Sequence, residues 1–223
     1  IESAEYELML SVTPELLDRF ESQLTAQHEA GVATEILLSP ADEAPDPDEY
    51  DYLSLADTVK VRRGITTPVV AVADGRYSIY ATRESLKGDS DRYGVIFDRS
   101  ELGFLVSMFL NTVLWTTSDT IAEDGDPLTF PRPYGTIRRA ISDLLALDGE
   151  FYATIEGRDV LTGDQVVVQG VIDEVTVGQH RETATLVVDN GEERIEVGGQ
   201  VAAYEDIESF EILIGRESPP EPV

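Results

Sequence analysis

The first forty residues alternate between apolar runs and a helical pattern. Residues 6–12 form an apolar run that predicts a strand, and Thr13-Pro14-Glu15 has the composition of a helix start, with Thr at the N-cap and Pro at the first position. A second apolar strand is predicted at 32–39. The helix between them carries its apolar residues at helical spacing until Gly31: Leu16, Leu17, Phe20 and Leu24. This order predicts a parallel β-α-β unit with a right-handed connection.

Short β-rich runs continue the pattern and predict a sheet of about five or six strands. Asp74-Gly75 favours a tight hairpin between two of them. Residues 40–52, rich in Pro, Asp and Glu, have the composition of an exposed, mobile loop. The predicted strands after this loop are 59–63, 68–73, 77–82 and 93–97.

A second long helix is predicted from Ser100-Glu101 to Ser118 or Ile121. Apolar residues occupy nearly all of its faces, so we expect it to be buried on most sides. Ser107, Asn111 and Trp115 nevertheless form a polar line at i, i+4 and i+8. Buried polar groups need partners, and the sequence leaves open whether these are internal groups or a ligand in a cleft.

The periodicity changes after a third predicted helix at 134–147, which ends at Asp148-Gly149. Strands are predicted beyond it at 151–155, 165–177, 183–188 and 194–197, with Asn190-Gly191 as a hairpin turn. We therefore expect an α/β domain over 1–148, a small all-β subdomain over 149–216 and a flexible tail over 217–223.

One stretch, VGGQVAAYEDIESF at 197–210, combines a glycine pair with acidic residues. Glycines let a ligand or another strand approach the backbone closely. A turn followed by a carboxylate can bind a polyhydroxylated molecule, because each sugar hydroxyl both donates and accepts hydrogen bonds. The alternative is a Gly-Gly hairpin followed by an acidic surface.

Composition narrows the class of protein. The hydrophobic fraction of 42% can fill a core, but the formal net charge is −28 and only Lys60 and Lys87 are lysines. Concentrated salt screens the repulsion among these charges, so the composition predicts a halophilic, cytoplasmic protein. A chain with this negative charge is also not expected to bind nucleic acid itself. The absence of cysteine excludes disulfides and thiolate chemistry, and no apolar run is long enough to span a bilayer.

With these stretches in order, the chain resembles the C-terminal effector-binding region of TrmB-family archaeal sugar-responsive transcriptional regulators. The most specific segments are Val197-Gly198-Gly199 through Tyr204-Glu205-Asp206-Ile207-Glu208 and the FLVSMFLNTVLWTT helix. The resemblance implies a phospholipase-D-like α/β sandwich followed by a small all-β subdomain, with a sugar bound in the cleft between them. A winged-helix DNA-binding domain would precede this region, as the start at Ile1 without Met suggests for a fragment, and the regulator is expected to be a homodimer.

The same resemblance implies the ligand contacts. On the glycine–acid stretch they are Gly199, Gln200, Ala203 and Glu205, and on the polar line they are Ser107 or Asn111. A further contact is expected near Gln179 or His180. No cofactor or metal is implied.

Two rival functions remain. Phospholipase-D chemistry needs His-x-Lys, but His28 is followed by Glu29-Ala30 and His180 by Arg181-Glu182, and a glycosidase carboxylate pair is a weak signal in so acidic a chain. A non-catalytic module for dimerisation or protein contact, using the apolar helix at 100–121 as its interface, is the second rival.

Overall fold

The structure is a computed structural model that describes residues 1–82, 94–98, 100–125, 128–178 and 183–222. The chain divides into two compact units, Ile1–Asp126 and Pro127–Val223. Each unit has its own sheet and its own hydrophobic core.

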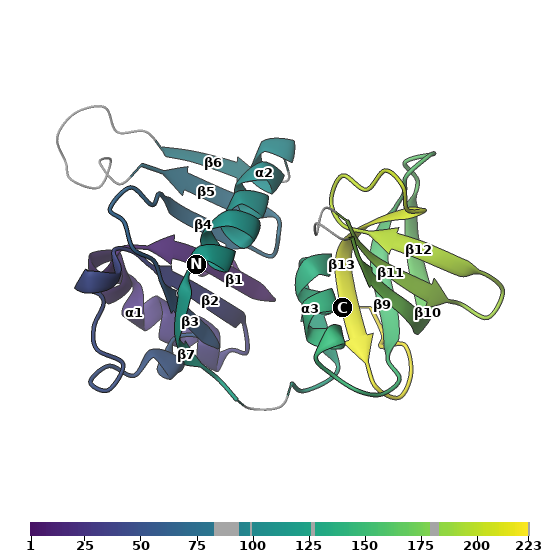
Figure 1. Cartoon of the computed structure of the whole chain (residues 1–223). Helices are drawn as coiled ribbons and strands as arrows, with labels where there is room; N and C mark the ends of the chain where they lie inside the picture. The colour runs from purple at the N-terminus through teal and green to yellow at the C-terminus, as the bar shows by residue number, and fades with distance from the viewer. Residues whose placement is uncertain (83–93, 99, 126–127, 179–182, 223) are drawn as a thin grey trace. The chain divides into compact units, whose positions relative to one another are not determined.

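The described strands of the first unit form one sheet in the order β6-β5-β4-β1-β2-β3-β7 (Figure 1). Strands β1, β2 and β3 are parallel, which confirms the predicted β-α-β unit, and the flanking strands are antiparallel. The strands are β1 (Glu7–Val12), β2 (Ala33–Leu38), β3 (Thr58–Val61), β4 (Val69–Ala73), β5 (Tyr77–Ala81), β6 (Gly94–Asp98) and β7 (Asp119–Glu123).

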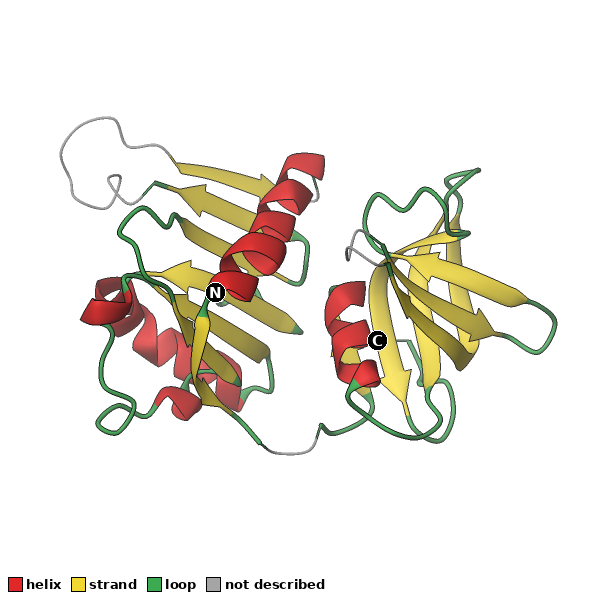
Figure 2. Ribbon diagram, in the orientation of Figure 1, coloured by secondary structure: helices red, strands yellow, loops and turns green. Residues whose placement is uncertain are grey.

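Helices cover both faces of this sheet (Figure 2). Helix α1 (Pro14–Glu29) starts as predicted, because Thr13 Oγ1 accepts a hydrogen bond from Leu16 N at 3.3 Å. Side chains alternate along β1: Leu8 and Leu10 pack in the core with α1, whereas Met9 packs in a second cluster with Leu110. The predicted α/β class is therefore confirmed for this unit.

The second helix is shorter and more exposed than predicted. Helix α2 (Glu101–Phe109) passes into a wider π-type turn at 110–114 and a tight turn at 115–117, and the chain then enters β7 instead of continuing as helix to 118 or 121. Its expected burial on most sides is wrong, because only the side facing the sheet is covered. Large apolar side chains between 38% and 59% exposed line its outer side: Leu102, Leu105, Phe109 and Val113.

The acidic loop at 40–52 is also not loose throughout. Tyr52 belongs to the core of the first unit, and its hydroxyl donates a 2.8 Å hydrogen bond to the Pro45 carbonyl. Tyr50 packs beside it with ring centroids 4.7 Å apart. The end of the loop is therefore anchored by aromatic burial.

The second unit is built around a closed sheet of long strands. Strands β9 to β13 pair in the order β12-β11-β10-β9-β13, and a parallel pairing of β12 with β13 closes the ring (Figure 1). Strand β8 extends it beside β13. The strands are β8 (Arg132–Tyr134), β9 (Tyr152–Asp159), β10 (Gln165–Val177), β11 (Ala184–Asp189), β12 (Arg194–Gly198) and β13 (Ile207–Gly215).

Helix α3 (Ile137–Leu145) belongs to this second unit, so the structural boundary lies near 126 and not after 148 as predicted. The reason is its apolar face: Ile137, Ile141 and Leu144 are buried in the same cluster as the barrel strands. The second unit is therefore a β-barrel with one packed helix, and the stretch predicted to be all-β, 149–216, forms the barrel strands β9 to β13.

The end of the chain also differs from the predicted flexible tail at 217–223. The Pro220 carbonyl accepts hydrogen bonds from Thr154 Oγ1 at 2.5 Å and Gln169 Nε2 at 3.5 Å. These contacts hold the last described residues against β9 and β10. Across the described part of the chain, no helix has the length and hydrophobicity needed to cross a membrane.

Candidate functional site

The loop between β12 and β13, residues 199–206, is the part of the glycine–acid stretch that leaves the sheet. Its two ends are joined by the parallel pair Val197 and Ile207. Asp206 ties it to both sides, since its carbonyl accepts from Val160 N and its own N–H donates to the Glu196 carbonyl, both at 2.9 Å. The end of the loop at Asp206 is therefore held to its neighbouring strands.

The glycine pair is required by contacts inside the protein. A Cβ on Gly198 would lie 2.8 Å from the Glu205 carboxyl carbon and from Ala202 Cβ. A Cβ on Gly199 would lie 2.8 Å from Cγ2 of Ile137 on α3. Each glycine thus admits a close approach, as expected from the sequence, but the approaching groups are side chains of this chain.

Glu205 is half-buried, and its carboxylate is fixed by two donors. Oε1 accepts from Thr185 Oγ1 on β11 at 2.9 Å, and Oε2 accepts from Tyr204 N at 3.3 Å. A carboxylate has about four lone-pair directions, so capacity remains for hydrogen bonds from a ligand. The arrangement presents a positioned acceptor at the edge of the loop.

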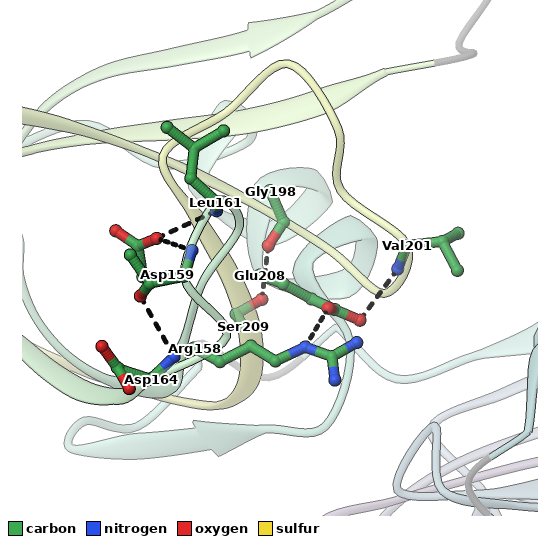
Figure 3. Close-up of polar contacts among 9 residues, drawn as sticks. Arg158, Asp159, Leu161, Asp164, Gly198, Val201, Glu208 and Ser209 are labelled. Carbon is green, nitrogen blue, oxygen red and sulfur yellow. Dashed lines mark hydrogen bonds and ion pairs between the residues drawn. The ribbon is translucent and has the colours of Figure 1, made fainter.

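A second carboxylate, that of Glu208, holds the loop through the backbone of Val201 (Figure 3). Only 7% of this residue is exposed. Its Oε2 accepts from Arg158 Nε at 2.6 Å and its Oε1 from Val201 N at 3.0 Å. Val201 has a φ of 57°, a strained value for a β-branched residue, and the bond to Glu208 holds it there.

Three further hydrogen bonds stiffen the surroundings of this carboxylate. Ser209 Oγ donates to the Gly198 carbonyl at 2.7 Å and joins the starts of the loop and of β13. Asp159 Oδ1 accepts hydrogen bonds from Thr162 N at 2.6 Å and from Leu161 N at 2.9 Å. These two bonds, of which the one from Thr162 has the larger effect, hold the pKa of Asp159 below its usual value. The turn next to the loop is thereby closed.

The structure brings together Gly199, Gln200, Ala203 and Glu205 in one loop. Gln200 is half-buried and Ala203 is exposed. The role of Glu208 and Arg158 was not predicted, because it depends on the register that places Glu208 opposite Arg158 across β13 and β9. The only signal in the sequence was an acidic residue at the start of a strand whose neighbouring residues are buried.

Ser107 and Asn111 lie in the first unit on the α2 segment. Ser107 is buried, and Asn111 Nδ2 donates to the Ser107 carbonyl at 3.0 Å and to its hydroxyl at 3.4 Å. Trp115, third in the polar line, has the Lys60 ammonium 4.7 Å from its ring centroid. The polar line thus has internal partners, while Gln179 and His180 lie outside the described residues.

The described residues include one histidine, His28, and many acidic side chains. No group of three or more His, Asp or Glu side chains among them is placed to hold a metal ion. His28, near the end of α1, has its Nδ1 3.9 Å from Asp57 Oδ1, and both side chains are partly exposed.

Comparison with known families gives two adjacent matches. The family described as "Transcriptional regulator TrmB, EBD N-terminal subdomain" matches residues 1–122, and "TrmB/TrmBL1, EBD C-terminal subdomain" matches residues 129–217, where EBD is the effector-binding domain. The gap between the matches coincides with the boundary between the compact units. No curated protein matches the chain.

Solved structures with similarity to the chain include two proteins. One is TrmBL2, described as an archaeal chromatin protein with a novel mode of DNA binding, at 16% identity and a TM-score of 0.42, covering 54% of this chain and 46% of that chain. The other is Nuc, a phospholipase D family member from Salmonella typhimurium, at 14% identity and a TM-score of 0.40, covering 55% and 86%. The chain spans less than half the length of the TrmBL2 chain.

Proposed function

Since the chain belongs to the TrmB family of transcriptional regulators, matching its effector-binding subdomains over most of its length, we propose that it is a sugar-sensing effector domain. The sugar binds at the β12–β13 loop, with Gly199, Gln200, Ala203 and Glu205 as contacts. The observation that carries this proposal is the Glu205 carboxylate, which is half-buried, held by Thr185 and turned back over Gly198.

The loop has the chemistry that a sugar requires. A fixed carboxylate accepts hydrogen bonds from sugar hydroxyls without first losing side-chain freedom, so less binding energy is spent on ordering. Ala203, two residues before Glu205 in the same loop, is small and exposed.

Binding regulates by shifting a conformational equilibrium. A ligand changes that equilibrium only through its different affinity for the two states, and an attached DNA-binding domain provides the readout. The net charge of −28 supports a division of labour in which this region binds the effector and leaves the DNA phosphates to another domain. No catalytic step forms part of this proposal.

A thermal-shift screen tests the proposal. At molar KCl, the unfolding midpoint is measured with glucose, maltose, trehalose, sucrose, fructose, glycerol and phosphorylated sugars, since a ligand that binds only the folded state raises the midpoint according to its affinity. Glu205→Gln is expected to weaken binding of the active sugar by about 1.5–3 kcal/mol, as for a hydrogen bond to a charged group. Glu192→Gln, on an exposed turn, is the matched control.

A dose-dependent rise that Glu205→Gln reduces and Glu192→Gln retains supports the sugar site and identifies the effector. If Glu205→Gln binds the sugar as tightly as the wild type, the assignment of the loop is wrong. If no compound in the panel raises the midpoint, the chain does not sense a sugar.

A second candidate function, self-association, is favoured by the exposed side of α2. Leu102, Leu105, Phe109 and Val113 form one stripe at helical spacing. Residues 102–118 contain no Asp, Glu, Lys or Arg, although the chain has 44 acids. A second copy of so acidic a chain can approach closely only through an uncharged surface, so we propose a homodimer through this stripe.

Light scattering after size-exclusion chromatography tests the dimer. Leu105→Gln is expected to shift the wild-type dimer towards monomer, because it places an amide in the centre of the apolar contact. Leu161→Gln, an equally simple change at a side chain 95% exposed in the second unit, is the control. A monomeric wild type, or a dimer unaffected by Leu105→Gln, contradicts the proposal.

A further inference from the structure

Tyr204 is a large aromatic side chain exposed to solvent, and in the sequence it directly precedes the proposed acceptor Glu205. It is 89% exposed, whereas Tyr52 and Tyr134 are buried in the cores of the two units. Tyrosine has an apolar ring and a polar tip, and aromatic side chains of this kind are enriched where proteins recognise ligands and partners. Its position directly before Glu205 makes it a candidate for recognition.

The exposure of the ring is not the result of a loose backbone. Tyr204 N donates to Glu205 Oε2, and the next peptide is held because Asp206 N donates to the Glu196 carbonyl. Earlier in the loop, Glu208 holds Val201 N in place (Figure 3). The loop therefore carries the ring on a fixed support, which lowers the entropy cost of using it in binding.

The pairing of a ring with a carboxylate matches the two surfaces of a cyclic sugar. A pyranose has hydroxyls around its edge and a face made largely of C–H groups. The edge hydroxyls donate to a carboxylate, while the C–H face loses water when it packs on an aromatic ring. An open-chain polyol has the same hydroxyls but no preformed apolar face.

We propose that Tyr204 is a specificity-determining residue that stacks on the pyranose ring of the effector. Resting on the proposed sugar function, this inference names the ligand class as a cyclic sugar and assigns discrimination against open-chain polyols to Tyr204. Glu205 binds the hydroxyls common to both classes, and Tyr204 supplies the contact that only the ring can make.

Calorimetric titration of the full chain with glucose, maltose and sorbitol at molar KCl tests this division. Tyr204→Ala is expected to weaken binding of the active sugar about tenfold, equivalent to about 1.4 kcal/mol. Tyr204→Phe keeps the ring and is expected to bind within about twofold of the wild type, since stacking does not use the hydroxyl. Leu161→Ala, which removes an exposed apolar side chain from the neighbouring turn, is the control.

The preference for sugar over sorbitol separates a specificity role from a general effect on the loop. In Tyr204→Ala the affinity ratio of glucose or maltose to sorbitol is expected to fall, whereas damage to the loop lowers both affinities together and overturns the inference. A second readout uses Tyr204→Trp in a Trp115→Phe background, because Trp115 is the only tryptophan. Its emission is expected to change on saturation with the sugar.

The failures of the two proposals are distinguishable. If Glu205→Gln loses affinity but Tyr204→Ala binds as the wild type does, stacking is wrong and the sugar site stands. If Tyr204→Phe loses as much affinity as Tyr204→Ala, the hydroxyl and not the ring makes the contact, which also overturns stacking. A wild type that binds none of the sugars overturns the sugar function and this inference with it.

Discussion

At the scale of single residues, the Glu208 carboxylate is expected to contribute more to stability than any exposed ion pair of the second unit. It is buried and accepts from Arg158 Nε and Val201 N, so Glu208→Ala leaves the strained Val201 without its partner. We expect a loss of about 1–3 kcal/mol in the free energy of unfolding, measured by urea denaturation. Glu208→Gln is expected to lose less, because its amide oxygen still accepts from Val201 N.

An exposed pair provides the comparison for Glu208. Arg194 Nη2 lies 2.7 Å from Asp173 Oδ2, but both side chains are about half exposed. Exposed pairs contribute about 0–1 kcal/mol, so Asp173→Asn should change the midpoint little. Equal losses in Asp173→Asn and Glu208→Ala would show that burial does not decide the strength of these bonds.

Two tyrosines at the end of the acidic loop predict an alkaline limit to stability. Burial raises the pKa of Tyr52 and of Tyr50 from 10.0 to about 12, with smaller contributions from nearby groups that include Asp18. Because the pKa of each tyrosine is higher in the folded state than in the unfolded state, folding favours the protonated phenols. Their contribution to the free energy of unfolding is fully present below pH 10 and is lost as the pH rises towards 12.

Tyr52→Phe tests this limit. Above pH 10, the variant should lose stability less steeply with pH than the wild type, since one of the two buried phenols no longer ionises. At neutral pH the same variant reports only the lost hydrogen bond to Pro45. Urea midpoints across this range measure both effects, and parallel pH curves for the two proteins would contradict the assignment.

At the scale of elements, periodicity predicted where most strands lie but not which sheet a helix covers. Residues 165–177 were predicted as a strand, and β10 has these bounds, because apolar positions and flanking turn residues mark its ends. Strand β7 was missed: it is a largely polar edge strand that follows directly on an apolar helical segment. The apolar face of α3 predicted that this helix packs against a sheet. It did not predict which sheet, because the apolar face of either one could cover it.

For the candidate loop, the sequence indicated the local residues but not the partners that hold them. Gly198, Gly199 and Glu205 stand out in the sequence because glycine pairs and nearby acids are local signals. The partners Thr185, Ile137 and Arg158 come from three other elements, and they depend on strand register and helix packing that no local pattern encodes.

The contact between α3 and the β12–β13 loop yields a prediction about these two elements. In Gly199→Ala the new methyl meets Ile137 Cγ2 at 2.8 Å, and a buried β-branched side chain has little freedom to move. We expect a destabilisation of about 1–3 kcal/mol, as for other overpacked cores. The double variant with Ile137→Ala should recover part of that loss, so a double-mutant cycle of thermal midpoints should show coupling, and strict additivity would disprove the contact.

At the scale of the whole molecule, the net charge of −28 sets the conditions under which the chain folds. Acids outnumber Lys and Arg by 44 to 16, so most carboxylates have no cation available and repel one another in the compact state. Salt shortens the range of that repulsion from about 10 Å at 0.1 M to about 3 Å at 1 M. The unfolding midpoint is therefore expected to rise steadily from low to molar KCl.

Salt also strengthens hydrophobic burial, so the charge contribution needs its own test. The exposed turn residues Glu192 and Glu193 have side chains directed to solvent, while their backbone N–H groups donate to Asn190 Oδ1. Replacing both with Gln removes two negative charges and keeps the turn. If repulsion limits stability, the double variant should have a higher midpoint than the wild type at low KCl, and the two should converge in molar KCl, where the charges are screened. If the difference in unfolding midpoint between the two proteins is the same at all KCl concentrations, the salt response comes from hydrophobic burial alone and not from screening of these charges.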